Sequence, residues 1–172
     1  MTAARRPRKG PGKRRVRLGL ILSLALGAVL TGVDAPAPRA ATTERVVVDQ
    51  HTGLALYGID PVAYFTERKP LPGRAEFEYS YAGAVWRFAN DGNRAAFAAD
   101  PDVYLPRYGG YDPVGVSRGL ATPGFPALWV VFGERLFLFY TAAGRAVFMA
   151  DPASVIASAS ARWAAVMGDL AE

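Results

Sequence analysis

Two stretches of the chain alternate apolar and polar residues in the manner of antiparallel β-hairpins. The first runs over residues 76–88 and turns at Ala82-Gly83, and the second runs over residues 128–140 and turns at Gly133-Glu134. Alternation with a period of two, interrupted by a glycine turn, predicts a hairpin. The second hairpin is apolar on both faces, so we expect it to be the buried, central one.

A pair of helices is expected after each hairpin. The first of each pair covers roughly residues 91–99 or 142–150, and each ends at an Asp-Pro dipeptide that starts the next helix. Aspartate caps the free N–H groups of a helix start, and proline fits the first helical position. Pro106 shortens the helix that starts at Pro101, whereas the helix from Pro152 continues because its apolar residues share one face.

The two hairpin-and-helix segments form a repeat. Residues 76–105 align with residues 127–156, and six of the eight positions that begin at Arg94 and Arg145 are identical. The pattern predicts an α+β fold in which two ββαα units pack as one small domain, residues 41–172, with an antiparallel sheet.

Three other segments of this domain are also assigned. A leading strand is expected at Thr42–Asp49, and Asp60-Pro61 is interpreted as a helix start in which Asp60 is the N-cap. Tyr108–Pro126 is rich in glycine and proline and is expected to be a long loop, which in a compact domain is often functional.

Residues 1–40 have the order of a secretory signal. A basic segment to Arg17 precedes an apolar run, Leu18–Val33, and a stretch rich in proline and alanine. They form either a cleaved signal peptide or an N-terminal anchor that holds the chain to the inner membrane through residues 18–33. Both alternatives place the domain outside the cytoplasm, in the periplasm or secreted, because the cations stay inside.

Composition removes several classes of function. Residues 1–17 carry eight Lys or Arg and no acid, while residues 41–172 carry eleven Lys or Arg against fourteen Asp or Glu. The domain therefore lacks the clustered basic face of a nucleic-acid binder. It has no cysteine and one histidine, which excludes disulfides and thiolate metal sites. No phosphate-binding loop is present, so no cofactor is predicted.

Several motifs resemble those of the exported bacterial YHS-domain proteins, over about residues 45–165. That family has no settled activity. The motifs are Gly58-Ile59-Asp60-Pro61-Val62-Ala63-Tyr64-Phe65, Pro70-Leu71-Pro72-Gly73, and the run from Trp86-x-Phe88 through Asn93-Arg94 and Pro101 to Tyr108-Gly109-Gly110-Tyr111.

The wider YHS class is similar to the TRASH-type modules, which hold metals through cysteines. The resemblance implies that those cysteine positions are Ala63, Ala89 and Asn93, and that a further reactive cysteine position of the exported branch is Asp112. The resemblance therefore implies that this chain keeps the fold of these modules but lacks their cysteines. Neither soft-metal binding nor redox chemistry carries over to it. No metal site is predicted.

Four residues are candidates for ligand binding: His51, Tyr64, Tyr111 and Asp112. His51 is either an exposed loop residue or a single group that titrates near neutral pH. Asp112 is either a cap before Pro113 or a carboxylate at the mouth of a pocket. The two tyrosines either pack in the core or line a pocket with a polar rim.

These observations favour a non-catalytic binding or interaction module whose partner is a small molecule or a periplasmic protein. One alternative is a carrier of a hard or borderline metal ion through carboxylate and imidazole ligands. The other is a hydrolase or lyase that uses Asp112 with His51, which requires the two side chains to lie within hydrogen-bonding reach.

Overall fold

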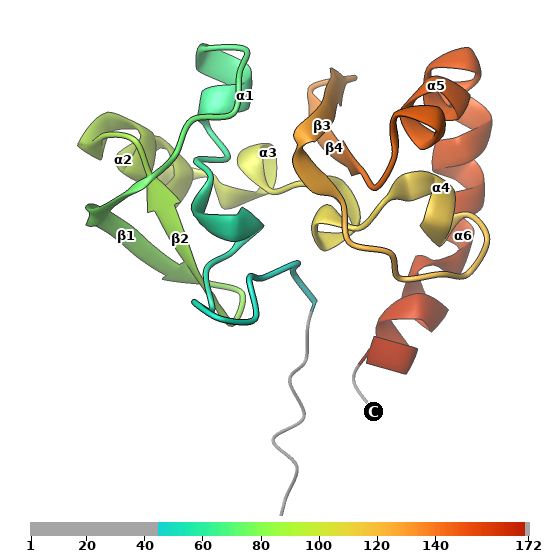
Figure 1. Cartoon of the computed structure of the whole chain (residues 1–172), viewed down its shortest axis with the longest axis horizontal. Helices are drawn as coiled ribbons and strands as arrows, with labels where there is room; N and C mark the ends of the chain where they lie inside the picture. Colours follow the sequence, from blue (N-terminus) through green and yellow to red (C-terminus); the bar gives the residue numbers. More distant parts are fainter. Residues whose placement is uncertain (1–44, 171–172) are drawn as a thin grey trace, which may run out of the picture. The chain divides into compact units, whose positions relative to one another are not determined.

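The computed structural model describes residues 45–170, which form an α+β arrangement (Figure 1). The strands of this part make two separate two-stranded antiparallel sheets, β1-β2 and β3-β4. The prediction of one antiparallel sheet is therefore wrong. The edges of β2 and β4 are already occupied, because Val85 bridges to Leu54 and Leu136 bridges to Pro106.

The first half of the described chain contains one hairpin with short helices before and after it. These elements are the 3-10 helix η1 (Leu56–Gly58), α1 (Ala63–Thr66), β1 (Arg74–Tyr81), β2 (Ala84–Phe88), α2 (Asp91–Ala99) and α3 (Pro101–Tyr104). The helix predicted at 91–99 is confirmed. The Asn90 side chain caps it by accepting a hydrogen bond from the backbone N–H of Asn93 at 2.8 Å.

The second half has the same order of elements. They are η2 (Arg107–Gly110), α4 (Pro113–Val116), β3 (Phe125–Phe132), β4 (Arg135–Phe139), α5 (Ala142–Ala150) and α6 (Pro152–Leu170). The helix predicted at 142–150 is confirmed, with Thr141 in the capping role that Asn90 has in the first half. The helix from Pro152 continues to Leu170, as its apolar face predicts, while α3 stops before Pro106.

The segment Tyr108–Pro126 is not a long loop. It contains η2, α4 and a bridge between Tyr111 and Pro123, and it matches the segment around Asp60 in the first half. In both halves three successive residues with positive φ precede the aspartate, Leu56–Gly58 and Tyr108–Gly110. The backbone N–H of Asp60 then donates to Leu71 O at 2.9 Å, and that of Asp112 donates to Thr122 O at 2.8 Å.

The predicted leading strand is reduced to one isolated β-bridge. Within residues 45–49 only Val48 forms an isolated bridge, to Ala55, and residues 42–44 lie outside the described residues. The predicted signal or anchor also lies outside them. In the part of the chain that the structure describes, no helix combines the length and the apolar character needed to cross a membrane.

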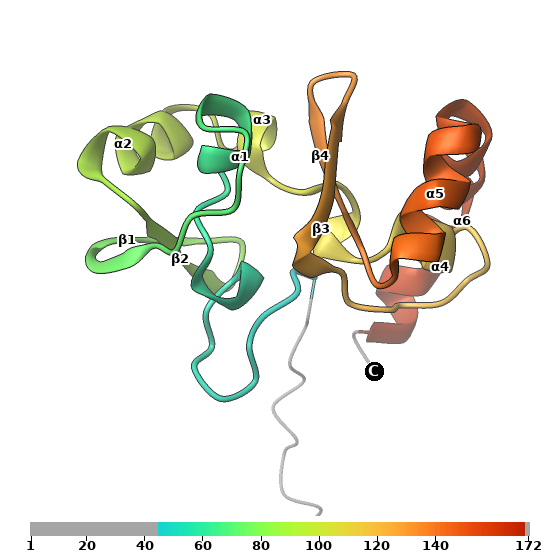
Figure 2. The same ribbon diagram turned by 45° about the horizontal axis from the view of Figure 1, so that its top comes forward.

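The second hairpin separates two hydrophobic cores, which confirms that it is central. Leu136 and Leu138 pack with the first-half core around Trp86, Phe88 and Phe97. Their neighbours on β4, Phe137 and Phe139, face the other way and pack with Tyr108, Phe148 and Ala159. Figures 1 and 2 show β3 and β4 between the elements of the first half and the helices α4, α5 and α6. Alternate residues of one strand thus serve two cores.

Candidate functional site

Asp60 is the centre of a buried hydrogen-bond network in the first half. Its carboxylate is fully buried in front of α1 and accepts four hydrogen bonds from N–H groups. Val62 N and Ala63 N donate to one oxygen at 2.8 and 3.3 Å, and Ala89 N and the Asn93 side-chain amide donate to the other at 2.8 and 2.6 Å. The network joins the start of α1 to the end of β2 and the first turn of α2.

The network brings together the three positions that the resemblance identifies with lost cysteines. Ala63 lies far in sequence from Ala89 and Asn93, which are four positions apart, yet all three donate to the same carboxylate. A soft metal would require thiolates at these positions, and the residues present offer methyl groups and an amide. The oxygens of Asp60 already accept four N–H groups, so these residues do not fit a metal ion.

Asp112 occupies the equivalent place in the second half and is 5% exposed. One carboxylate oxygen accepts from Val114 N at 2.8 Å and the other from Tyr140 N at 3.1 Å. Asp112 thus caps α4, the first of the two roles considered for it. Gly144 stands where the first half has Asn93, and a Cβ there would lie 3.1 Å from the Asp112 carboxylate.

Tyr64 is buried and ties the two halves together. Its hydroxyl donates to Pro126 O at 3.0 Å, and its ring packs edge-on against Trp129 with centroids 5.2 Å apart. Burial, and secondarily the negative charge of Asp60, raise the pKa of the Tyr64 phenol. The phenol therefore stays protonated and keeps donating to Pro126 O.

His51 and Tyr111 line one surface hollow of about 270 Å³, together with Asp49, Tyr57 and Pro123. The His51 imidazole is 98% exposed, while Tyr111 is buried with its ring 6.1 Å from that of Trp163. The backbone N–H groups of His51 and Thr52 donate to Asp49 and lower the pKa of its carboxyl. The structure thus brings His51 and Tyr111 together.

Tyr64 and Asp112 do not line this hollow. No hydrogen bond joins His51 to Asp112, whose carboxylate faces backbone N–H groups instead. Within residues 45–170 no cluster of three or more His, Cys, Asp or Glu side chains is arranged to hold a metal ion.

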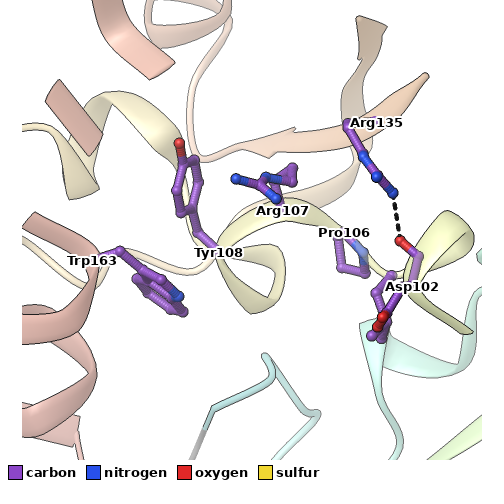
Figure 3. A pocket seen from close by; sticks show the side chains of 7 residues that line it. Asp102, Pro106, Arg107, Tyr108, Arg135 and Trp163 are labelled. Atoms are coloured by element: carbon purple, nitrogen blue, oxygen red, sulfur yellow. Dashed lines mark hydrogen bonds between the residues drawn. The ribbon is translucent and has the colours of Figure 1, made fainter. Parts of the chain in front are cut away.

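A second pocket, of about 410 Å³, was not anticipated from the sequence (Figure 3). It lies where the chain passes from α3 into the second half, and residues from α3, η2, β4 and α6 line it. They are Asp102, Leu105, Pro106, Arg107, Tyr108, Arg135 and Trp163. Arg135 donates to the backbone carbonyl of Asp102 at 2.7 Å.

A sequence signal for the match between the two aspartates was present. Gly58-Ile59-Asp60-Pro61-Val62 and Gly110-Tyr111-Asp112-Pro113-Val114 share four of five residues. The two motifs lie upstream of the repeat units 76–105 and 127–156, respectively. Extended upstream with one extra residue in the first half, so that the offset changes from 51 to 52, the alignment pairs Asp60 with Asp112.

Residues 62–108 match the family model of the YHS domain. A YHS domain is therefore present from the residue before α1 to η2, and it includes Ala63, Ala89 and Asn93. No curated protein and no solved structure matches the chain.

Proposed function

We propose that this protein is a non-catalytic binding module that acts outside the cytoplasm and takes an organic ligand rather than a metal ion. It uses a YHS domain as a scaffold. The observation that carries the proposal is the hydrogen-bonded Asp60 carboxylate at the point where Ala63, Ala89 and Asn93 meet.

The metal-binding role is disfavoured by the chemistry of this cluster. A cation bound to Asp60 would have to displace N–H donors, and each displaced buried donor would lose its partner at a cost of about 1–3 kcal/mol. No thiolate or imidazole is present among the three surrounding residues to compensate. The four hydrogen bonds therefore already satisfy the Asp60 carboxylate without a metal ion.

A catalytic role is disfavoured by the placement of the acid and base candidates. General acid–base chemistry needs two groups within hydrogen-bonding reach of one substrate atom. Asp112 is buried and directs its oxygens at Val114 N and Tyr140 N, while His51 is exposed and lies 3.7 Å from Asp49. Asp112 and His51, the pair that the hydrolase hypothesis requires, therefore do not face one common site.

Export is supported by the sequence of residues 1–40, in which a basic segment, an apolar run and small residues follow one another. The mildly acidic character of residues 41–172 supports a partner other than nucleic acid. A ligand of small size is supported by the two hollows at His51 and at Arg107.

Thermal unfolding of the full chain with a panel of small organic solutes tests this function. A ligand that binds the folded state raises the melting temperature, and at a hundredfold excess over Kd it adds about 2.7 kcal/mol to the free energy of unfolding. We expect at least one solute to produce such a concentration-dependent rise. Unchanged melting temperatures with every solute at millimolar concentration would contradict the proposal.

A further inference from the structure

The pocket between the two halves combines positive charge with an aromatic wall. Its lining contains two guanidinium groups, Arg107 and Arg135, and the rings of Tyr108 and Trp163 (Figure 3). A volume of about 410 Å³ lies within the range of about 300–1,000 Å³ that is usual for small-molecule sites.

Both guanidinium groups are held in place without a carboxylate partner in the described part of the chain. Arg74 and Arg87 pair with Glu76 and Glu78, whereas no ion pair within residues 45–170 includes Arg107 or Arg135. Arg135 is fixed by the carbonyl of Asp102, and the guanidinium of Arg107 lies 5.5 Å from the centroid of the Tyr108 ring. Because these side chains are already held in place, they lose less conformational entropy when a ligand binds.

The fold itself does not require these arginines. In the equivalent positions of the first half, Ala55 stands for Arg107 and Ala84 stands for Arg135. Both alanines are buried in a half with the same order of elements. The two arginines of this pocket are therefore specific to the second half and are not needed for the order of elements that both halves share.

Trp163 supplies an apolar surface beside the charges. It belongs to the part of α6 that extends beyond the length of α3, and its ring packs against Tyr108 with centroids 5.6 Å apart. The hydroxyl of Tyr108 is already used, since it bonds Ile156 O at 3.2 Å and Ser160 at 3.0 Å. The half-buried indole therefore remains as the stacking surface for a flat ligand.

We infer that this pocket binds a small aromatic carboxylate, an inference that rests on the proposed binding function. The carboxylate accepts hydrogen bonds from Arg107 and Arg135, because a guanidinium matches the geometry of two carboxylate oxygens. The ring of the ligand lies against Trp163. Asp102 also lines the pocket, and its negative charge opposes that of the ligand, but the two guanidinium groups leave the lining with a net positive charge.

Titration of the full chain with benzoate, in a buffer free of carboxylates, tests the inference by calorimetry. We expect saturable binding at one site, with acetate at least about tenfold weaker because it has no ring. In the double variant Arg107→Ala/Arg135→Ala the affinity for benzoate should fall by about tenfold or more, since hydrogen bonds to a charged group are lost. The variant should fold, because the first half carries alanine at both positions.

Arg145→Ala is the matched control, because Arg145 is an exposed arginine of α5 that does not line the pocket. It should bind benzoate as the unaltered chain does. Equal affinity in the double variant, or binding of inorganic phosphate without benzoate, would overturn the inference. A response to other solutes but not to benzoate overturns this inference alone, whereas no response to any solute overturns the proposed function as well.

Discussion

Replacing Asp60 by alanine is expected to lower the free energy of unfolding by about 3–5 kcal/mol. The substitution leaves Val62 N, Ala89 N and the Asn93 amide without an acceptor at the fully buried position of the Asp60 side chain. Each unpaired buried donor costs about 1–3 kcal/mol. Urea unfolding followed by circular dichroism measures the change.

The equivalent variant Asp112→Ala should lose less, about 2–4 kcal/mol, because its carboxylate accepts from Val114 N and Tyr140 N and lacks a side-chain donor. Glu67→Ala is the control, since Glu67 is exposed and its side chain has no partner in the described part of the chain. It should change stability by less than about 0.5 kcal/mol. If Asp60→Ala were as stable as this control, Asp60 would not hold the network together.

Gly124→Ala should be the second severe substitution, with an expected loss of about 3 kcal/mol from overpacking. A Cβ at this position would lie 2.6 Å from Leu138 Cβ and 2.8 Å from Gly110 O. Gly124 N donates to Gly110 O at 2.9 Å, so the backbone cannot withdraw without breaking this bond. Gly73→Ala in the first half should behave alike, because a Cβ there meets the Cβ and backbone of Arg87.

The same change at Gly168 is a control with the opposite sign. Gly168 lies inside α6, and a Cβ there would meet nothing within 4 Å. Alanine stabilises an exposed helical position over glycine by up to about 1 kcal/mol. Thermal unfolding of the three variants should separate Gly73→Ala and Gly124→Ala from Gly168→Ala. A neutral Gly124→Ala would show that β4 is not in close contact with this glycine.

The sequence allowed the local elements to be predicted, because their signals are local. Period-two alternation and glycine turns marked both hairpins, and the Asp-Pro dipeptides marked the ends of the helices at 91–99 and 142–150. The two-sided apolar character of the second hairpin also predicted its place between the cores.

Pairing between distant segments could not be predicted in the same way. One antiparallel sheet was expected, but Leu54 and Pro106 occupy the edges of β2 and β4, and both belong to irregular segments without a strand pattern. The helix α4 has four residues, too few for a hydrophobic period to appear. It was therefore assigned to a loop.

The candidate site was predictable only in part. Asp60 was interpreted as the N-cap of a helix that starts at Pro61, but α1 begins at Ala63 with Val62 in the N-cap position, and Asp60 accepts from Val62 N and Ala63 N just before it. The bonds that Asp60 accepts from Ala89 and Asn93 connect residues about thirty positions apart, and no local rule indicates them. The pocket at Arg107 and Arg135 likewise depends on the contact between η2, β4 and α6. Two scattered arginines in a sequence carry no sign that they share a pocket.

Metal content tests the central claim most directly. The full chain, purified without chelators and then dialysed against zinc(II) or copper(I), should contain far less than one metal ion per chain by elemental analysis. The reason is that Asp60, Ala63, Ala89 and Asn93 satisfy one another by hydrogen bonds and contain no thiolate. One equivalent of tightly held metal in the unaltered chain, lost in Asp60→Ala, would contradict the account.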